Sequence, residues 1–328
     1  MLKLGFIGTG RIAQAHLKAA ANLAQDVQVV SIAGRNRERA EMIAGQYGIP
    51  KVAGDYRQLL DDPNVHAVVI TTPNDSHAEI TCAAAEAGKN VLVEKPMALD
   101  SGSASDMVKA ADAAGTILMV AQSRRFSDAA QTLVRRLSEI GNVFRIHIIF
   151  LVPFPAPPTD WWRSAEKAGG LVMLLQGSHS LDSIFWWLGR LPSQIFATAT
   201  RRNAAWEGED EADILCTFPD ATASVHLSLS TTPVFHESLV VGMHGHFRMI
   251  EQPAGPPFES VSRLELNGKP ILEGLQTPSA YTNQLREFAN AVREKRTPLA
   301  SGREILNVMR MLDAARQSAR VGAPVSVA

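Results

Sequence analysis

The first thirteen residues place the strongest constraint on the fold, because an apolar run breaks into a glycine-rich turn and then into a helical pattern. The run of residues 2–7 predicts a buried strand, and the next six residues spell GTGRIA, a G-x-G-x-x-A sequence. Gly8 permits a tight turn out of the strand, Gly10 lets a pyrophosphate approach the backbone, and Ala13 lets the helix pack closely on the sheet. A plain structural turn is the alternative, because glycines end strands in many proteins.

A helix that begins near Arg11 would point its N–H groups and the positive end of its dipole at the phosphates. The position of the motif, between a strand and a helical pattern, is the context that a dinucleotide site requires. We therefore predict that the cofactor is bound by Gly8, Thr9, Gly10, Arg11 and Ile12.

Composition limits the class of protein. The chain has 328 residues, 46% of them apolar and 20% charged, with a net charge of −1, and it offers enough length for two globular domains. Such a balance argues against nucleic acid or an anionic membrane as the main partner. There is no apolar run of about eighteen residues that would span a membrane. The N-terminus shows no basic region or cleavage site, so we expect no signal peptide.

The cysteines and histidines indicate a reducing compartment and no metal. Cys82 and Cys216 are too few for a disulfide framework, so we expect free thiols and a cytoplasmic location. His244 and His246 flank a glycine that marks a hairpin turn, and no third ligand accompanies them.

The segment 1–121 alternates strand and helix patterns. Short apolar runs, typical of strands buried on both faces, are separated by segments with apolar residues at helical spacing. This order predicts an α/β class and a doubly wound parallel sheet, a Rossmann domain. The expected strands are residues 2–7, 27–33, 51–53, 65–71, 91–93 and 117–121, and the expected helices are residues 11–23, 37–47, 76–87 and 104–114.

The pattern changes after Ala121, and we assign residues 122–328 to a second domain. Strands that follow one another without intervening helices form an antiparallel sheet. The domain is therefore expected to be α+β, built on a large, mostly antiparallel open sheet. The expected strands are residues 143–152, 194–201, 211–218, 221–230, 234–242, 246–251 and 260–266, and the expected helices are residues 126–140, 176–188, 279–293 and 303–320. The helices can cover one face of the open sheet, so the other face suggests a homo-oligomer.

The second strand ends in AGRNR, where an NAD site usually places an acidic residue for the ribose 2′-hydroxyl. No carboxylate stands there, and Arg35 and Arg37 are present instead. A guanidinium suits a 2′-phosphate, which favours NADP over NAD. The alternative is that both arginines are solvated residues at the start of a helix.

Two further segments follow strands of the first domain, at the edge of a parallel sheet where ligands bind. The first is TTPNDSH, from which Thr72, Pro73, Asn74 and His77 are predicted to contact the cofactor, although His77 alone is better explained as a first-turn residue. The second is Glu94-Lys95-Pro96, all three of which are also predicted to contact the cofactor. The Lys95 ammonium would bind a substrate hydroxyl and relay its proton, and a solvated surface lysine is the alternative.

Together these motifs resemble the glucose-fructose oxidoreductase/inositol dehydrogenase/MocA family. The resemblance extends from GTGRIA, AGRN, TTPNDSH and VLVEKPMA through WWR and GG…QGSH to the ending YTNQLREFANAV and RQSARVGAPVSV. It implies a Rossmann domain, a C-terminal domain with a large open sheet, and NAD(P)-dependent oxidation or reduction. Substrates of the family are mostly sugars, polyols and cyclic diols, and its sheet typically mediates dimers or tetramers.

The family's second catalytic segment has the form GGG-V-L-L-D-x-G-x-H, and here it departs from that form. His179 matches the family histidine, whereas Leu171 replaces the third glycine and Leu175 replaces the aspartate. A leucine side chain cannot accept a hydrogen bond from a sugar hydroxyl. Either Lys95 and His179 still run the hydride chemistry on a less polar substrate, or the scaffold supports another reaction, or the protein binds a nucleotide without turnover.

The resemblance implies that Lys95 and His179 are catalytic. It also implies a substrate site made of Lys95, Trp162, Arg163, Gln176 and His179, in which the tryptophan ring would stack on an apolar face and the arginine would bind an anion. Interdomain packing is the alternative for the tryptophan. The sequence as a whole predicts an NADP- or NAD-dependent dehydrogenase or reductase of a small hydroxylated or carbonyl compound. The competing hypothesis is a dinucleotide-binding protein with altered or lost catalysis.

Overall fold

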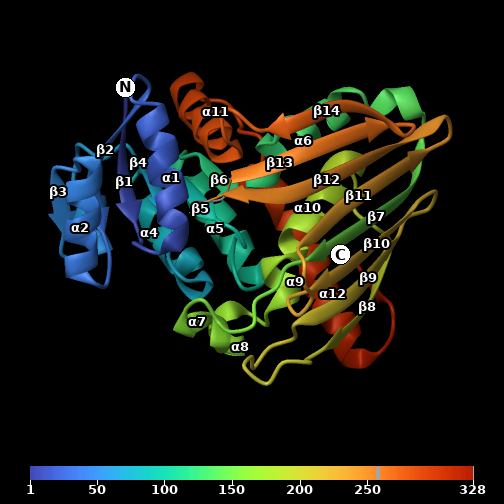
Figure 1. Cartoon of the computed structure of the whole chain (residues 1–328). Helices are drawn as coiled ribbons and strands as arrows, with labels where there is room; N and C mark the ends of the chain where they lie inside the picture. The colour runs from blue at the N-terminus through green and yellow to red at the C-terminus, as the bar shows by residue number, and fades with distance from the viewer. Residues whose placement is uncertain (256–258, 328) are drawn as a thin grey trace. The chain divides into compact units, whose positions relative to one another are not determined.

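The computed structural model describes residues 1–255 and 259–327 (Figure 1). The chain divides into two units, and neither is a continuous stretch. The first unit contains Met1–Ala98, Gly102–Ser123 and Pro278–Leu306, and the second contains Leu99–Ser101, Arg124–Thr277 and Asn307–Ala328.

The first unit is built on a six-stranded sheet in the order β3-β2-β1-β4-β5-β6, and all five pairings are parallel. The strand order reverses between β1 and β4, which creates the crevice where doubly wound sheets bind ligands at their carboxyl edge. The strands are β1 (Leu2–Ile7), β2 (Val27–Ala33), β3 (Lys51–Ala53), β4 (Ala67–Ile70), β5 (Asn90–Glu94) and β6 (Leu118–Ala121).

Helices between these strands explain why the central strands are largely apolar. All four residues of β4 have no exposed surface, as expected for a central strand covered on both faces. The helices are α1 (Arg11–Asn22), α2 (Arg37–Tyr47), α3 (Tyr56–Leu60), η1 (Asn74–Ser76), α4 (His77–Glu86) and α5 (Ser101–Ala114). The predicted Rossmann fold is therefore confirmed, with α3 as an addition that its five residues were too few to reveal by periodicity.

A segment from near the C-terminus completes the first unit, which differs from the predicted division at residues 121 and 122. Helix α11 (Ala280–Glu294) packs on α1, where the rings of Tyr281 and His16 meet edge to face with centroids 5.3 Å apart. Further along, the Val120 N–H donates to the Ala300 carbonyl over 2.9 Å. Residues 278–306 thus cover this unit, a long-range pairing that local patterns do not encode.

The second unit contains a nine-stranded sheet in the order β14-β13-β12-β11-β7-β10-β9-β8-β15. Among the described residues only β7 and β10 pair in parallel, and the other pairs are antiparallel. The strands are β7 (Val143–Leu151), β8 (Gln194–Thr200), β9 (Glu211–Thr217), β10 (Thr222–Ser228), β11 (Phe235–Gly242), β12 (Gly245–Gly255), β13 (Glu259–Leu266), β14 (Lys269–Leu275) and β15 (Val325–Ser326). The predicted mostly antiparallel sheet is confirmed.

Strand β14 is not among the predicted strands. It forms a hairpin with β13 through Asn267 and Gly268, whose φ angles of 52° and 76° define a tight turn. Pro270 and the charged residues on β14 obscure its strand pattern in the sequence. β14 lies at the edge of the sheet, where a proline is tolerated.

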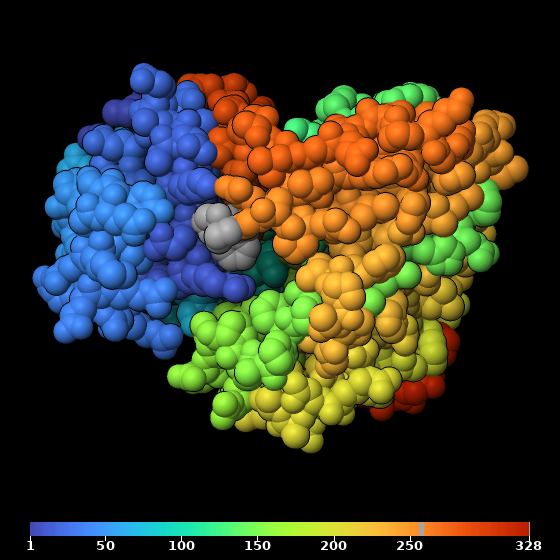
Figure 2. All heavy atoms as spheres, viewed as in Figure 1, coloured from blue at the N-terminus to red at the C-terminus, as the bar shows by residue number. Residues whose placement is uncertain are grey.

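The two faces of this sheet have different surroundings. Ile146, Ile148 and Phe150 point to the buried face, which α10 covers, whereas Ile149 on the other face is 37% exposed. In Figure 1 strands β11 to β14 lie in front of α10, and Figure 2 shows their gold and orange atoms at the surface.

The remaining helices of the chain are short, apart from α10 and α12. The predicted helix over residues 126–140 is divided into three pieces. These helices are η2 (Ser123–Phe126), α6 (Asp128–Arg135), η3 (Leu137–Ile140), α7 (Asp160–Arg163), α8 (Ala165–Ala168), α9 (Val172–Leu175), α10 (Gly177–Leu188) and α12 (Gly302–Val321).

The described residues lack two structural features. None of their helices is long and apolar enough to cross a membrane. Within the same ranges, no three His, Cys, Asp or Glu side chains gather as metal ligands.

Candidate cofactor and catalytic site

The glycine turn after β1 packs against the end of β4. Gly8 has a φ of +113°, and a Cβ atom at this position would lie 2.6 Å from the backbone carbon of Thr71. The Thr71 hydroxyl donates to the Gly8 carbonyl over 3.1 Å. A side chain at position 8 is therefore excluded by both conformation and space.

Gly10 has a different surrounding. Its backbone is extended, and a Cβ atom there would meet only the Thr71 carbonyl oxygen, at 3.8 Å. Gly10 is the N-cap residue of α1, so no side-chain cap stands over the start of that helix. A helix N-terminus with open space beside it is the arrangement that binds phosphate groups, and it fits the pyrophosphate of a dinucleotide.

The end of β2 lies beside the same turn. A Cβ atom on Gly34 would come within 2.6 Å of the Thr9 side chain, so the two loops touch. Arg35 follows directly and is exposed. The Arg37 Nε donates to Glu41 over 2.8 Å, whereas within the described residues no hydrogen bond or ion pair holds the Arg35 side chain. Of the two predicted arginines, Arg35 is thus the one available to a ribose phosphate.

The loop after β4 is held by its own polar side chains. The Ser76 hydroxyl makes hydrogen bonds of 2.8 Å with the Thr72 hydroxyl and the Pro73 carbonyl. Asn74 begins η1 and is buried, with 3% of its surface exposed. The loop therefore has a defined conformation at the carboxyl edge of the sheet.

His77 bridges two of the predicted segments. Its ring is fully buried, with Nδ1 2.8 Å from the Pro96 carbonyl oxygen and Nε2 3.0 Å from the Thr72 carbonyl oxygen. Burial lowers the pKa of His77, while both carbonyls favour the protonated ring. This geometry favours a first-turn structural role, since the imidazole fastens the Thr72 loop to the Pro96 loop. Contact with a cofactor stays a prediction for this residue.

Glu94 and Lys95 end β5. Glu94 is 6% exposed, and its two oxygens have different partners. Oε1 lies 2.8 Å from Nε2 of His16, and Oε2 accepts from the Lys95 backbone N–H over 3.0 Å. The Lys95 side chain is half-buried, and the Lys95–Pro96 peptide bond is cis. The role of the Lys95 side chain stays a prediction.

In the second unit, Glu209 anchors the segment that departs from the family form. Its Oε1 accepts from the Leu171 and Met173 N–H groups over 2.9 and 3.2 Å, and its own carbonyl accepts from Val172. This carboxylate satisfies N–H groups at the start of α9, a capping role. Sequence reasoning missed Glu209, because it lies 36 residues beyond the last amide that it binds.

Leu175, Gln176 and His179 follow the anchored segment. Leu175 is 2% exposed and Gln176 is 7% exposed, while His179 on α10 is half-buried. The amide oxygen Oε1 of Gln176 is buried and has no hydrogen-bond partner among the described residues. The His179 N–H donates to the Gln176 carbonyl over 3.1 Å, so the two residues share one turn.

Asp182 makes a buried ion pair that the sequence did not reveal. Its carboxylate receives two hydrogen bonds from Arg125, from Nε over 2.9 Å and from Nη2 over 2.7 Å. The two side chains are 2% and 1% exposed. The Asp182 carboxylate is therefore buried and paired, not solvated. The pair joins α10 to the segment that carries Arg125. Removing one partner of such a buried pair lowers the free energy of unfolding by about 3–5 kcal/mol.

Trp162 and Arg163 lie in α7. The Trp162 ring is half-buried among Phe154, Trp161 and Trp206, with centroid distances of 5.1, 5.8 and 6.4 Å. Arg163 is exposed. The aromatic contacts support packing within this unit as the role of Trp162, and contact with a substrate stays a prediction for both residues.

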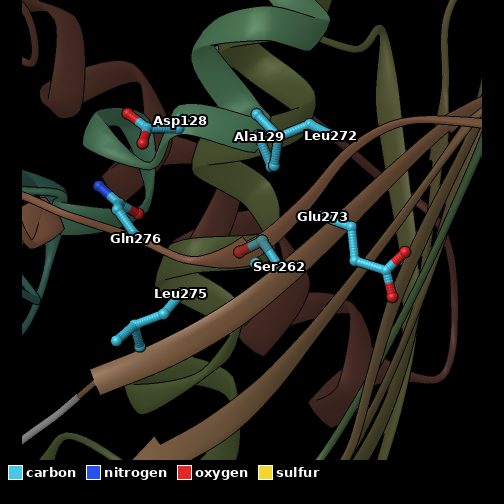
Figure 3. A pocket seen from close by; sticks show the side chains of 8 residues that line it. Asp128, Ala129, Ser262, Leu272, Glu273, Leu275 and Gln276 are labelled. Atoms are coloured by element: carbon cyan, nitrogen blue, oxygen red, sulfur yellow. The ribbon is translucent and has the colours of Figure 1, made fainter.

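Figure 3 shows a pocket of the second unit that contains none of the predicted residues. It has a volume of about 200 Å³ and lies between α6 and the β13–β14 hairpin. Its two carboxylates, on Asp128 and Glu273, lie at opposite sides and do not converge (Figure 3). The pocket therefore lacks the converging polar groups of an active site.

The structure brings the glycine turn, Arg35, the Thr72 loop and the Glu94–Pro96 segment together at one edge of the first unit's sheet. It brings Gln176 and His179 together in the second unit. Lys95 and His179 thus belong to different units, and their joint action remains a prediction.

Comparisons with known proteins agree with this reading of the first unit. The family described as "Oxidoreductase family, NAD-binding Rossmann fold", GFO/IDH/MocA, matches residues 2–122, and the GFO/IDH/MocA C-terminal domain matches residues 129–248. D-xylose 1-dehydrogenase (NADP(+)) 2 of Haloferax volcanii is 29% identical, over 99% of this chain and 100% of that protein. Scyllo-inositol 2-dehydrogenase (NAD(+)) of Bacillus subtilis is 27% identical, over 99% and 96%.

Solved structures share the fold. The aldose-aldose oxidoreductase of Caulobacter crescentus, complexed with glycerol, superposes with a TM-score of 0.88 at 25% identity, covering 99% of each chain. These similarities bear out the predicted resemblance, the fold class, and NADP or NAD as cofactor, and they give no support to the non-catalytic alternative. The chain belongs to the GFO/IDH/MocA family of NAD(P)-dependent oxidoreductases.

Proposed function

We propose that this protein transfers a hydride between NADP(H) and a small sugar, polyol or cyclic diol. The observation that carries the proposal is the half-buried Lys95, whose backbone is held by Glu94 at the carboxyl edge of the parallel sheet. The relatives named for xylose and inositol support the substrate class. Buried Leu175, in place of the family aspartate, favours a substrate with fewer hydroxyl groups than a hexose.

Each residue has one role in this proposal. The bound nicotinamide supplies or accepts the hydride. In the direction of oxidation, the hydride leaves the substrate C–H and His179 takes the proton of the hydroxyl, because imidazole titrates near neutral pH. The Lys95 ammonium donates a hydrogen bond to the same oxygen, which stabilises the developing carbonyl. In the direction of reduction, His179 returns the proton.

The catalytic roles are tested by Lys95→Met and His179→Ala. Each change removes a proton-transfer or hydrogen-bonding group from the reacting oxygen, so kcat should fall by about 10²-fold or more. The measurement is initial-rate kinetics with NADP(H) on a panel of sugars, polyols and cyclic diols. Exposed Lys109 and His66 provide the control variants Lys109→Met and His66→Ala, which should keep full activity. Near wild-type turnover in both test variants would refute the assignment.

The glycine turn offers a pair of variants that separate folding from cofactor binding. Gly8→Ala should lower the free energy of unfolding by about 2–4 kcal/mol, because its Cβ meets the Thr71 backbone at a positive φ. Gly10→Ala should leave that energy within about 1 kcal/mol, yet weaken NADPH binding by roughly tenfold or more, since the methyl group stands in the pyrophosphate's path. Denaturant titration and NADPH fluorescence measure the two effects. Unchanged NADPH binding in Gly10→Ala would place the pyrophosphate elsewhere.

We propose that Arg35 binds the 2′-phosphate and gives the preference for NADP. Arg35→Asp should weaken NADPH binding by about tenfold or more through charge repulsion, with little effect on NADH. Arg37→Asp is the matched control, because its guanidinium is paired with Glu41. Fluorescence titration with both cofactors decides the question. NADH binding as tight as NADPH binding in the wild type would show that Arg35 is only a surface residue.

We propose a homodimer or homotetramer formed through the open face of the nine-stranded sheet. Apolar side chains on this face are 36–44% exposed: Ile149, Phe196, Leu215 and Phe235. Exposed apolar patches of this kind mark protein interfaces. Light scattering at micromolar concentration should give the mass of two or four chains, and Leu215→Arg should reduce it. Met243→Arg, at a hairpin tip, should not. A wild-type mass of one chain would overturn the proposal.

A further inference from the structure

One buried histidine of the first unit has no part in the proposed chemistry. His16 lies on α1, has no exposed surface, and places Nε2 2.8 Å from Oε1 of Glu94. The contact joins the helix that begins at the glycine turn to the segment that carries Lys95, 78 residues further along the chain. The contact therefore couples the position of α1 to the position of the Lys95 segment.

The surrounding contacts define which atom carries the proton. The Glu94 carboxylate accepts from the Lys95 N–H through Oε2, so it acts as an acceptor on both sides. His16 must therefore donate from Nε2. Its Nδ1 has no hydrogen-bond partner among the described residues, so within that range the bond from Nε2 to Glu94 is the one hydrogen bond that orients the ring. The bond is charge-assisted, and its burial strengthens it.

The ring cannot easily rotate away from Glu94. Tyr281 of α11 meets it edge to face at 5.3 Å, and α1 itself is a rigid element. His16 lies five residues after Arg11 on this helix, an axial distance of about 7.5 Å at 1.5 Å per residue. The N-terminus of α1 and the Glu94 carboxylate are thus connected by a little more than one turn of helix and the His16 side chain.

We propose that His16 is a positioning residue for Lys95. The His16 ring binds the Glu94 carboxylate, and this carboxylate accepts a hydrogen bond from the Lys95 backbone N–H. Helix α1, which begins at the glycine turn, therefore determines the position of Lys95. The inference rests on the proposed function, because it requires that Lys95 acts on the substrate. It assigns to His16 an effect on the chemical step rather than on cofactor affinity.

The test compares two variants of similar size in the full-length protein. His16→Gln keeps an N–H donor near the position of Nε2, whereas His16→Met fills the same space without one. We expect kcat of His16→Met to fall on the order of tenfold or more, with the NADPH dissociation constant changed less than about threefold. His16→Gln should recover most of the activity and stay within about threefold of the wild type. A role in stability alone would leave kcat per folded molecule unchanged.

Three results would overturn the inference. They are a wild-type kcat in His16→Met, an equal loss of kcat in His16→Gln and His16→Met, and a loss confined to NADPH binding. Glu94→Gln provides a second route if His16→Met does not fold, since it disrupts the same pair and should lower kcat similarly.

Lys95→Met distinguishes this inference from the proposed function. If Lys95→Met keeps its turnover, the proposed function fails, and the positioning of Lys95 fails with it. If Lys95→Met is inactive while His16→Met has wild-type kcat, the proposed function stands and only the role of His16 is refuted.

Discussion

The close approach of the glycine turn to the end of β4 is the constraint on which the first unit depends. Gly8 lies so near the Thr71 backbone that a Cβ atom cannot fit, and the Thr71 hydroxyl holds the Gly8 carbonyl. This contact fixes both sides of the crevice where the strand order reverses. It also determines the direction in which α1 leaves the sheet, and therefore where His16 lies on that helix. The cofactor site is thus shaped first by backbone packing, to which the Thr71 hydroxyl adds a hydrogen bond.

Polar contacts also connect the loop after Thr71, the Glu94–Pro96 segment and helix α1 to one another. The loop after Thr71 is fastened by His77 to the Pro96 carbonyl, and the preceding Glu94 is fastened to His16 of α1. The three segments that the sequence marks as functional are therefore joined by one network of buried contacts. A substitution in one segment is expected to shift the other two, because each buried group has its partner on a neighbouring segment.

Local patterns predicted the parts of the fold that local physics determines. The Rossmann strands, the glycine turn and the antiparallel sheet followed from apolar periodicity and turn residues. Three features depend on long-range contacts and were missed: residues 278–306 in the first unit, the Glu209 cap, and the Arg125–Asp182 pair. In each case the residue type was ambiguous by itself. A carboxylate such as Glu209 or Asp182 is most often solvated, and only the folded chain shows its partner.

The two units also differ in how directly a sequence indicates their chemistry. Cofactor binding relies on glycines, whose absence of a side chain leaves a recognisable motif. Substrate binding relies on side chains that change with the substrate, and Leu175 illustrates the consequence. Leu175 is buried beside Gln176 and cannot accept a hydrogen bond. A substrate hydroxyl directed at it would lose its water without a new partner, at a cost of about 1–3 kcal/mol. Under the proposed function, this residue discriminates against substrates that carry a hydroxyl group at that position.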